Sequence, residues 1–502
     1  MQTNVHKFVG ILGALSIGVL PLSTIHAAEW TKGASVALGS YYSDNICLQP
    51  DDKEGKAVGT VTPSVNLRGE GARARASLSG SVEYNTLAES SLTCSGRGQN
   101  FNNREAFVPR LSALGELEAI ENWLVFDASA QASQNAINPF AAGGDDNLNG
   151  VGNTNVTYRW GVGATIDRRL SEVWRLLLGY NYNEQYNSVS RALGDSQEDR
   201  VVFDFGMNPA TSRFSAGLAG RYSEVTFDGS TGQEPFVNKL SSVELRTALQ
   251  VSDSWQLNAL AGQEDNVFLS NVPEIDGNYW DAGVRWAPNS RVEVTAGYGE
   301  RFFGETPRFS ISYRHKRSSL RASYDRDLQF PRNIRAADGG LDPGDPLVPD
   351  VDLPGDPVGG AGDPTFIGQT PVLNERFTLN YRFNARRTTI SLTASDSQQT
   401  RAQDGRQGSF RNFSAAVTRS LSSGLSAFGR LSYRESEGAN SDDSIDLARG
   451  FETWRGTLGL NQRLSSKTSM ALAYAYIDQQ SVNDFRSFVE NRVTLTLRYN
   501  FR

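Results

Sequence analysis

The chain ends on the stretch VTLTLRYNFR, which spans residues Val493 to Arg502. Apolar or aromatic side chains (Val493, Leu495, Leu497, Tyr499 and Phe501) alternate without a break with polar ones (Thr494, Thr496, Arg498 and Asn500). A period of two places the two sets on opposite faces of a β-strand. The fold must therefore explain why a long chain finishes on a two-faced strand with aromatic residues at its tip.

The same alternation recurs along the chain, for example at residues 71–85, 156–166, 173–183, 376–383 and 469–476. These strands run for about 10–14 residues, which is longer than the usual globular strand of about 5–6 residues. A tilted strand that crosses a bilayer needs about 9–11 residues. Apart from the N-terminal segment, no apolar run approaches the roughly 20 residues of a transmembrane helix. The pattern thus favours membrane-spanning strands.

The connections between the strands fall into two classes. Ten are short and turn-like, near residues 68, 120, 168, 209, 253, 288, 315, 384, 422 and 465. The other side has eleven connections. Nine of them are long and polar, and two, near 302–305 and 483–487, are shorter. Short turns on one side and long loops on the other are typical of bacterial outer-membrane barrels. The prediction is an all-β, single transmembrane antiparallel up-and-down β-barrel of about 22 strands, with a range of 18 to 24.

Closure of the barrel explains why the chain finishes on a two-faced strand. An open sheet edge in lipid would leave backbone N–H and C=O groups without partners, at a cost of several kcal/mol each. The final strand is therefore expected to pair with the first, Ala34–Ser43. A secreted propeller or solenoid is the alternative, but such folds repeat a motif at a fixed period, whereas the connections here are irregularly spaced.

The N-terminus has the pattern of a secretory signal peptide. His6 and Lys7 precede an apolar stretch, and small residues follow at Ala27 and Ala28. We expect a cleaved signal peptide at 1–28, cut after either Ala27 or Ala28, and a barrel at 29–502 integral to the bacterial outer membrane. Outer-membrane lipid and the barrel-assembly machinery are the expected partners. The terminal strand resembles the recognition signal of that machinery, with Tyr499 and Phe501 as its aromatic residues, although Arg502 follows where Phe usually ends the chain.

Cys47 and Cys94 are the two cysteines of the chain. The strand pattern places them in neighbouring loops on the long-loop side. An exported protein reaches an oxidising compartment, where disulfides persist. A Cys47–Cys94 disulfide is therefore expected, with two free thiols as the alternative.

Catalytic, cofactor and metal motifs are not evident. The net charge of −7 does not suggest nucleic acid. After the signal peptide the one histidine is His315, which the pattern places in a short turn, so we expect no enzyme and no cofactor. The Asp-rich loop at 330–371 lacks the spacing of a calcium-binding loop, and is expected to fold partly into the lumen. The Asp/Asn/Gly loop at 141–153 is expected to be a surface turn.

The polar face of the strands is the remaining place for function. It is rich in arginine, since Lys is 7 of the 49 basic residues; codon usage alone could produce this bias. The candidates for lining the lumen are Arg73, Arg75, Glu83, Arg159, Arg175, Arg321, Asp325, Arg376 and Arg382. Such rows either form a structural network or line a pore that selects its solute.

Two stretches, Pro63–Ala88 and Arg110–Phe140, resemble the outer-membrane β-barrel family associated with the PEP-CTERM/exosortase system, as do the signal peptide and the ending LTLRYNF. The resemblance implies a Gram-negative bacterium that sorts proteins to its surface and makes exopolysaccharide. It implies no site residues. The expected function is a channel or scaffold for PEP-CTERM sorting and exopolysaccharide export, with exopolysaccharide or its export components as partners. The alternatives are a general or solute-selective porin, a closed barrel that acts as a surface anchor or adhesin, and a surface enzyme that uses the long loops.

Overall fold

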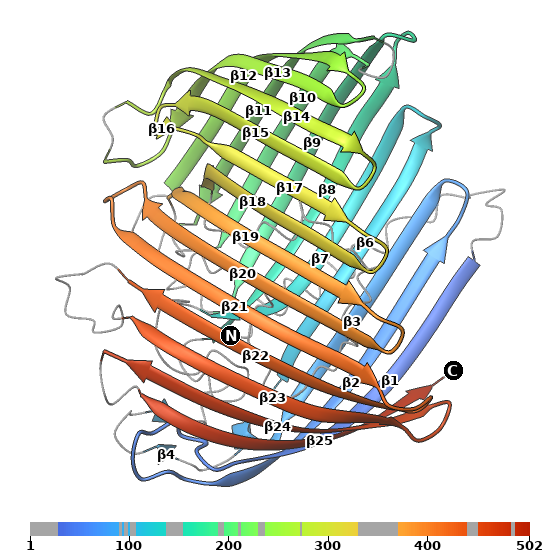
Figure 1. The fold of residues 1–502 in the computed structure, drawn as a ribbon, viewed down its shortest axis with the longest axis vertical. Coiled ribbons are helices and arrows are strands. Elements are labelled where there is room, and N and C mark those ends of the chain that lie inside the picture. Colours follow the sequence, from blue (N-terminus) through green and yellow to red (C-terminus); the bar gives the residue numbers. More distant parts are fainter. Residues whose placement is uncertain are drawn as a thin grey trace.

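The chain forms a closed antiparallel β-barrel in a computed structural model (Figure 1). Of the 502 residues, the structure describes 29–89, 93–94, 99–100, 107–136, 154–188, 195–208, 212–228, 236–271, 274–329, 370–438, 450–482 and 487–501. The main sheet has 23 strands, one of which is the two-residue β16, so 22 strands form the wall. This confirms the predicted all-β, closed antiparallel barrel and its number of strands.

The wall strands are β1 (Glu29–Ser43), β2 (Lys56–Glu70), β3 (Ala74–Asn85), β6 (Phe107–Ile120), β7 (Leu124–Ala136), β8 (Thr154–Arg169), β9 (Trp174–Asn187), β10 (Ser196–Met207), β11 (Phe214–Phe227), β12 (Phe236–Ser252), β13 (Trp255–Val267), β14 (Gly277–Asn289), β15 (Val292–Arg301), β17 (Arg308–Arg314), β18 (Ser318–Gln329), β19 (Val372–Asn384), β20 (Thr388–Arg401), β21 (Gln407–Ser420), β22 (Leu425–Glu437), β23 (Phe451–Arg463), β24 (Thr468–Ser481) and β25 (Phe488–Phe501). The short elements are η1 (Thr86–Glu89), β4 (Thr93–Cys94), β5 (Gln99–Asn100) and β16 (Gly304–Glu305).

The first and last strands close the barrel. β1 and β25 pair antiparallel from Ala34 opposite Phe501 to Ser43 opposite Arg492. Each of the other wall strands pairs with its neighbours along the chain. The backbone groups along the seam thus find partners, and the expected pairing of the final strand with Ala34–Ser43 is confirmed.

The short connections lie at one end of the barrel, where all ten predicted turns are found between paired strands. His315 is in one of them, between β17 and β18, and its backbone N–H donates to Ser318 O at 2.7 Å. Residue Asn122, in the turn between β6 and β7, takes a left-handed backbone conformation (φ 56°), which Asn tolerates better than most residues. The signal peptide 1–28, residues 141–153 and nearly all of the 330–371 loop lie outside the described residues.

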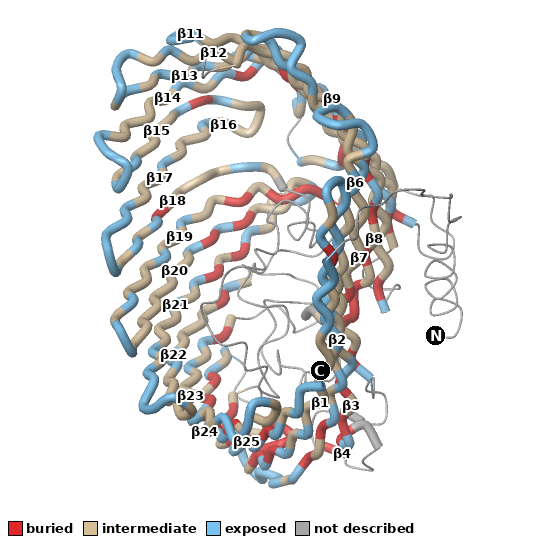
Figure 2. The backbone as a smooth tube through the Cα atoms, turned by 90° about the vertical axis from the view of Figure 1, so that its right-hand side faces the viewer, coloured by how far each residue is buried: buried red, intermediate tan, exposed pale blue. Residues whose placement is uncertain are grey.

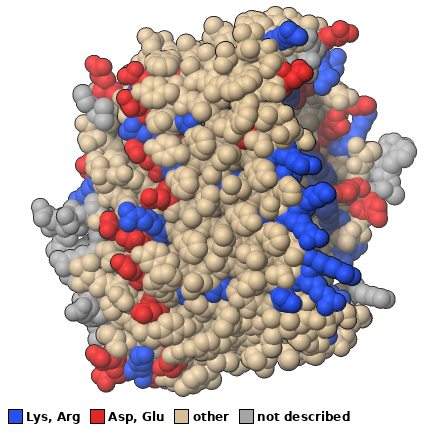
Figure 3. Space-filling view, viewed as in Figure 1, with Lys and Arg blue, Asp and Glu red and all other residues tan. Residues whose placement is uncertain are grey.

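The two faces of the sheet differ as the alternation predicts. On β25, Val493, Leu495 and Leu497 are 40–47% exposed on the outer surface, while Thr494 and Thr496 are buried on the inner side. Figure 3 shows the outer surface as a broad uncharged band between two rims, with Lys and Arg gathered along the rim of short turns. None of the helices in the described ranges is long and apolar enough to cross a membrane.

Aromatic residues mark both edges of the uncharged band. Near the short turns, exposed aromatic residues are Trp30, Trp123, Trp174, Phe214, Trp255, Tyr313, Tyr499 and Phe501; near the long loops they include Tyr42, Phe107, Trp280, Tyr298, Trp454 and Tyr476. Two aromatic girdles that flank an apolar band are typical of transmembrane barrels.

Candidate functional site

The lumen face of the barrel is the candidate site, and the alternation of each strand defines which residues belong to it. On β22, for example, Leu431 is exposed on the outer surface. Arg430, Ser432 and Arg434 then point to the inner side, because successive side chains of a strand face opposite ways. The same rule, applied with the exposed apolar residues as the outer reference, assigns the lumen face of every wall strand.

Eight of the nine predicted lumen residues lie on this face, namely Arg75, Glu83, Arg159, Arg175, Arg321, Asp325, Arg376 and Arg382. Arg73 is the exception: it lies in the turn between β2 and β3, where it forms an ion pair with Glu121 of the next turn at 2.7 Å. The alternation extended one residue too far there, because the strand ends at the hairpin. The structure also brings Asp325 and Arg376 together across β18 and β19, at 3.6 Å.

One side of the lumen is charge-balanced. We call the lumen face of β3–β15 the balanced wall. Four of its arginines pair with carboxylates of the same wall, Arg75 with Glu116 (2.9 Å), Arg175 with Asp167 (2.6 Å), Arg246 with Asp204 (3.1 Å) and Arg285 with Glu293 (3.0 Å). Arg308 of the adjoining β17 reaches Asp281 (2.9 Å), and Arg159 Nη2 donates to Gln185 Oε1 (3.0 Å). Each pair keeps its field local, because opposite charges a few ångströms apart cancel at a distance.

Glycine allows one of these arginines to lie flat against the wall. The Arg308 guanidinium passes over Gly297 and Gly283 on its way to Asp281. A Cβ at Gly297 would stand 2.6 Å from Arg308 Nε, and a Cβ at Gly283 would stand 2.8 Å from its Nη2. A larger residue at either position would push the guanidinium away from the wall.

The most buried charges of the balanced wall form a cluster near the long loops. Glu264 is 2% exposed and accepts from Arg301 Nη2 at 2.6 Å. The Arg301 guanidinium lies over the Tyr279 ring, 5.6 Å from its centre, and also pairs with Asp327 at 3.1 Å. The Tyr279 hydroxyl donates to Glu244 Oε2 at 2.6 Å. A buried network with this many partners fixes the positions of its side chains, so we interpret it as a rigid structural part of the wall.

The other side of the lumen has a different composition. We call the lumen face of β17–β23 the arginine wall. It carries Arg308, Arg314, Arg321, Arg376, Arg382, Arg430, Arg434, Arg455 and Arg463. Among its described residues the acidic side chains are Asp325 and Asp327, which pair with Arg376 and Arg301. The remaining acidic residues of these strands, such as Asp396, Glu435 and Glu452, point outward near the long loops. Among the described lumen-facing residues of these strands, arginines therefore outnumber carboxylates.

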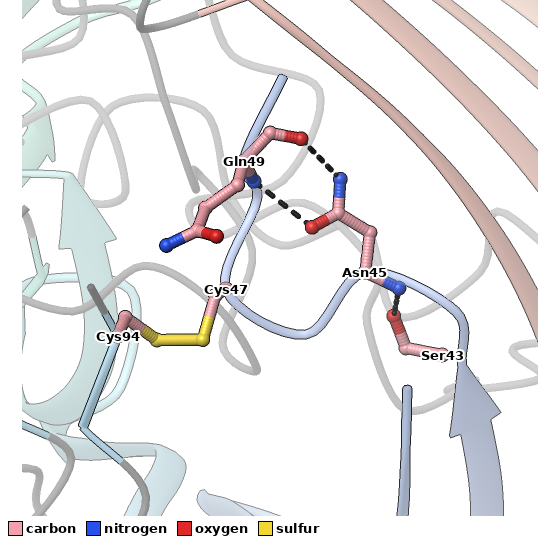
Figure 4. The surroundings of a disulfide bond; sticks show 5 residues. All are labelled: Ser43, Asn45, Cys47, Gln49 and Cys94. Atoms are coloured by element: carbon pink, nitrogen blue, oxygen red, sulfur yellow. Dashed lines mark hydrogen bonds between the residues drawn. A yellow bond between two sulfur atoms is a disulfide. The ribbon is translucent and has the colours of Figure 1, made fainter. Parts of the chain in front are cut away.

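A disulfide fixes the loops at the long-loop end of the seam (Figure 4). Cys47, in the connection from β1 to β2, is bonded to Cys94, as expected, with 5.5 Å between their Cα atoms. Both cysteines are buried, in a cluster with Tyr41, Ile46, Val58 and Leu87. Asn45 stabilises the same loop, because its side chain donates to Gln49 O (2.7 Å) and to Val489 O at the start of β25 (3.0 Å).

A buried ion pair lies beneath this loop. Glu490 and Arg492 of β25 are each about 1% exposed, and Arg492 Nη2 lies 2.8 Å from Glu490 Oε1. Ser43 of β1 donates to the same carboxylate oxygen at 2.6 Å, and the Arg492 guanidinium lies 5.6 Å from the centre of the Tyr41 ring. Figure 2 shows buried residues gathered where β1, β3, β4 and β25 meet. The seam is thus closed from the lumen side as well as by backbone pairing.

Metal or catalytic chemistry would need clustered His, Cys and carboxylate side chains. In the part of the chain that the structure describes, no group of three or more His, Cys, Asp and Glu residues could hold a metal ion. His315 stays in its short turn, stacked against Tyr313 with 6.5 Å between ring centres.

Several lumen residues were not singled out from the sequence. Glu264, Tyr279 and Arg301 were not predicted individually, although the alternation in WQLNALAGQEDNV places Glu264 inward. Arg430 and Arg455 also lie on inward-facing positions of alternating strands. The division into two walls has no signal in any single strand, since it depends on which strands stand side by side.

Comparison with known proteins supports the fold. No family model and no curated protein matches the chain. Among solved structures, the FrpB iron transporter from Neisseria meningitidis (F5-1 variant) is similar, with a TM-score of 0.53 and 10% identity over 94% of this chain and 83% of that one. The siderophore receptor PirA from Acinetobacter baumannii has a TM-score of 0.51 and 10% identity, covering 94% and 81%. A ferric enterobactin receptor from Pseudomonas aeruginosa has a TM-score of 0.50 and 10% identity, covering 95% and 82%.

These similarities concern the fold. The chain shares the barrel fold of proteins described as an iron transporter and as receptors. Identities of about a tenth establish a shared fold and carry no site residues across, so the function has to be argued from the lumen.

Proposed function

We propose that this chain is an integral barrel of the bacterial outer membrane whose lumen conducts a hydrophilic solute or polymer. The observation that carries the proposal is the wall itself, with an apolar band between aromatic girdles outside and charged and hydroxyl side chains inside. At 22 strands the interior is too wide for the side chains of the wall to fill. A polar lumen of this width suits transport better than the purely mechanical role of an anchor.

The particular cargo we propose is exopolysaccharide, within a PEP-CTERM/exosortase setting, after export of the chain by a signal peptide at 1–28. Its support is the resemblance of Pro63–Ala88 and Arg110–Phe140 to the barrel family of that system. Uptake of small solutes, as in a porin or as the names of the structural neighbours suggest for iron complexes, is the competing proposal. A surface anchor or adhesin is the third.

Liposomes test the transport claim directly. The protein is refolded into vesicles loaded with a mixture of fluorescent sugars and dextrans of graded size. The expected result is release of sugars and short dextrans, with a size limit. Retention of every solute by vesicles that contain heat-modifiable, folded barrel would contradict transport and favour the anchor.

A deletion strain separates the cargoes. We expect loss of the gene to lower the polysaccharide released into the medium, while uptake of small sugars and of ferric siderophores is unchanged. The reverse outcome, with normal polysaccharide and impaired uptake, would support the porin or iron-uptake proposal and contradict export.

A further inference from the structure

The short turns between β17 and β24 carry a row of basic residues at one end of the outer surface. We propose that this row binds the headgroups of anionic phospholipids in the leaflet that surrounds the short-turn end of the barrel. The inference rests on the proposed membrane location of the barrel. It goes beyond transport, because it names a partner of the outer surface rather than a solute of the lumen.

Four consecutive short turns supply the basic residues. We call them the basic rim: Lys316, Arg317, Arg386, Arg387, Arg419 and Lys467. Five of the six are exposed, and Lys467 is half-buried. The chain around these turns, at residues 312–321, 380–391, 416–430 and 460–471, contains no Asp or Glu. Figure 3 shows Lys and Arg as a band along this rim. The four turns therefore present charge of one sign.

Arg419 relates the basic rim to the apolar band. It lies on the outer face of β21, because it follows the exposed Val417 by two residues and alternate side chains of a strand share a face. Two residues of strand correspond to about 7 Å, and the headgroup layer extends about 5–8 Å beyond the hydrocarbon core. The exposed Leu421 follows in the turn. Arg419 thus stands at the level where phospholipid headgroups meet the barrel.

The spacing of the turns suits a layer of headgroups. Successive short turns are two strands apart, which is about 10 Å along the rim at about 4.8 Å for each strand step. The four turns together span six strand steps, roughly 29 Å. One small anion cannot contact them all, whereas a leaflet presents a phosphate to each turn. Arginine binds phosphate with its planar fork, and lysine binds it as a point charge.

The surroundings of the rim favour a lipid over an acidic protein. Tyr313 is exposed on the outer surface three residues before Lys316, and Tyr499 lies opposite the residue that follows Lys467. Aromatic and basic side chains together are typical of a membrane interface. A protein that docked on the end of the barrel would meet the tips of the turns. It would not reach Arg419, which stands between two lipid-facing apolar residues.

The opposite rim of the outer surface differs in composition. Its outward cations on β12, β18 and β21 lie beside outward carboxylates: Lys239 is 3.0 Å from Glu224, Arg326 is 3.0 Å from Glu375 and Arg411 is 3.2 Å from Glu435. Carboxylates and cations are thus mixed near the long loops. Anionic headgroups are therefore expected to gather at the short-turn end.

The test uses the full-length refolded protein in phosphatidylcholine vesicles. A fluorophore is attached to the single added thiol of Leu421→Cys, a 45% exposed position beside Arg419, and brominated phosphatidylglycerol or brominated phosphatidylcholine is the quenching probe. The test variant is Lys316→Gln/Arg386→Gln/Arg419→Gln. The matched control is Lys239→Gln/Arg326→Gln/Arg411→Gln, which also removes one lysine and two arginines from the outer surface, but near the long loops. Heat-modifiability on gels verifies folding of both.

We expect phosphatidylglycerol to quench the fluorophore at about a fivefold lower concentration than phosphatidylcholine, since one cation near an anionic lipid contributes about that factor. The test variant should reduce this preference to less than about twofold, and the control should keep it. Added salt should weaken the preference. Glycerol phosphate should weaken it no more than sodium chloride of the same ionic strength does.

Three results would overturn the inference: equal quenching by the two lipids, a preference that survives in the test variant, or an equal loss in both variants. A specific effect of glycerol phosphate would assign the rim to soluble phosphate instead. Displacement of the lipid by polyglutamate would assign it to an acidic protein, and either assignment would overturn the inference as well.

The outcomes separate this inference from the proposed function. Steady current without a lipid preference would overturn the inference and leave the channel standing. A preference for phosphatidylglycerol in barrels that pass no current would support the basic rim while contradicting transport. Protein that does not float with the vesicles would contradict the membrane location on which both rest.

Discussion

Val36 and Tyr499 lie opposite each other in the antiparallel pairing that joins the first strand of the barrel to the last. They belong to a seam of ten paired positions, from Ala34–Phe501 to Ser43–Arg492. The residues joined here are 449 to 467 positions apart in the chain, so the seam joins the two ends of the folded sheet. Features at the seam should therefore control assembly and stability together.

The aromatic tip of β25 is expected to be needed for assembly. Tyr499 and Phe501 are 40% and 51% exposed on the outer surface, with 5.0 Å between their ring centres. The variant Tyr499→Ser/Phe501→Ser removes apolar contact with lipid of about 1.5–3 kcal/mol for each side chain, and also the aromatic pattern of the terminal strand. We expect less heat-modifiable barrel in the outer-membrane fraction.

The matched control is Trp280→Ser/Tyr298→Ser. These residues form an aromatic pair on the outer surface at the other end of the barrel, 6.0 Å apart. If both variants lowered barrel levels equally, the loss would be one of general stability, and a special role for the terminal strand would be contradicted.

The Cys47–Cys94 disulfide should form in the exported protein and stabilise the seam. Mass mapping without reductant is expected to find the cross-linked peptide. The variant Cys47→Ser/Cys94→Ser should lose about 3–4 kcal/mol of unfolding free energy, the loop-closure value for a separation of 47 residues. Both thiols found free in protein from the outer membrane, or unchanged stability of the variant, would contradict this account.

The buried pair of Glu490 and Arg492 should behave as a unit. The variant Arg492→Met leaves the buried Glu490 carboxylate with Ser43 but without its cation, which typically costs about 3–5 kcal/mol. Removing both charges in Glu490→Gln/Arg492→Met should recover most of the loss, because no uncompensated charge remains. Urea unfolding of the refolded barrel measures both, and additive losses would show that the two residues act independently.

Acid should loosen the connection between β20 and β21. Asp404 accepts a hydrogen bond from Arg401 Nε at 2.9 Å, and this bond is the main cause that lowers the pKa of the Asp404 carboxyl below its ordinary value. A lowered pKa means that the stabilisation is complete above the unfolded value of about 3.9 and is lost as the pH falls through the folded value.

Amide exchange of residues 402–406, corrected for the intrinsic rate at each pH, checks this prediction. The variant Asp404→Asn should exchange faster than the wild type at pH 7, and the difference should begin to shrink below about pH 4 and vanish once the pH is below the lowered pKa of Asp404. A difference that is the same at both pH values would show that the carboxylate charge is not involved.

Much of the architecture could be predicted because successive side chains of each wall strand alternate between the apolar outer surface and the polar lumen. Each residue faces lipid or lumen, so alternation in a single segment such as Val493–Phe501 identifies the strand and its outer face. Turn residues then fix the number of strands. Arg73 shows the limit of this argument, because alternation alone does not reveal where a strand gives way to its hairpin.

The character of the lumen could be predicted less well. The pairing of Asp325 with Arg376 depends on the register of β18 against β19, and the cluster of Glu264, Tyr279 and Arg301 spans three strands. Register and neighbourhood are properties of the closed sheet. Lumen charges could therefore be proposed from the sequence, whereas their division into a balanced wall and an arginine wall required the structure.

The central claim is that the lumen conducts, and the current through single refolded barrels in a planar bilayer tests it most directly. The account predicts discrete, steady conductance steps at neutral pH and moderate salt. Bilayers that remain silent although folded, inserted barrel is verified in them would contradict the account and favour a closed barrel that serves as an anchor.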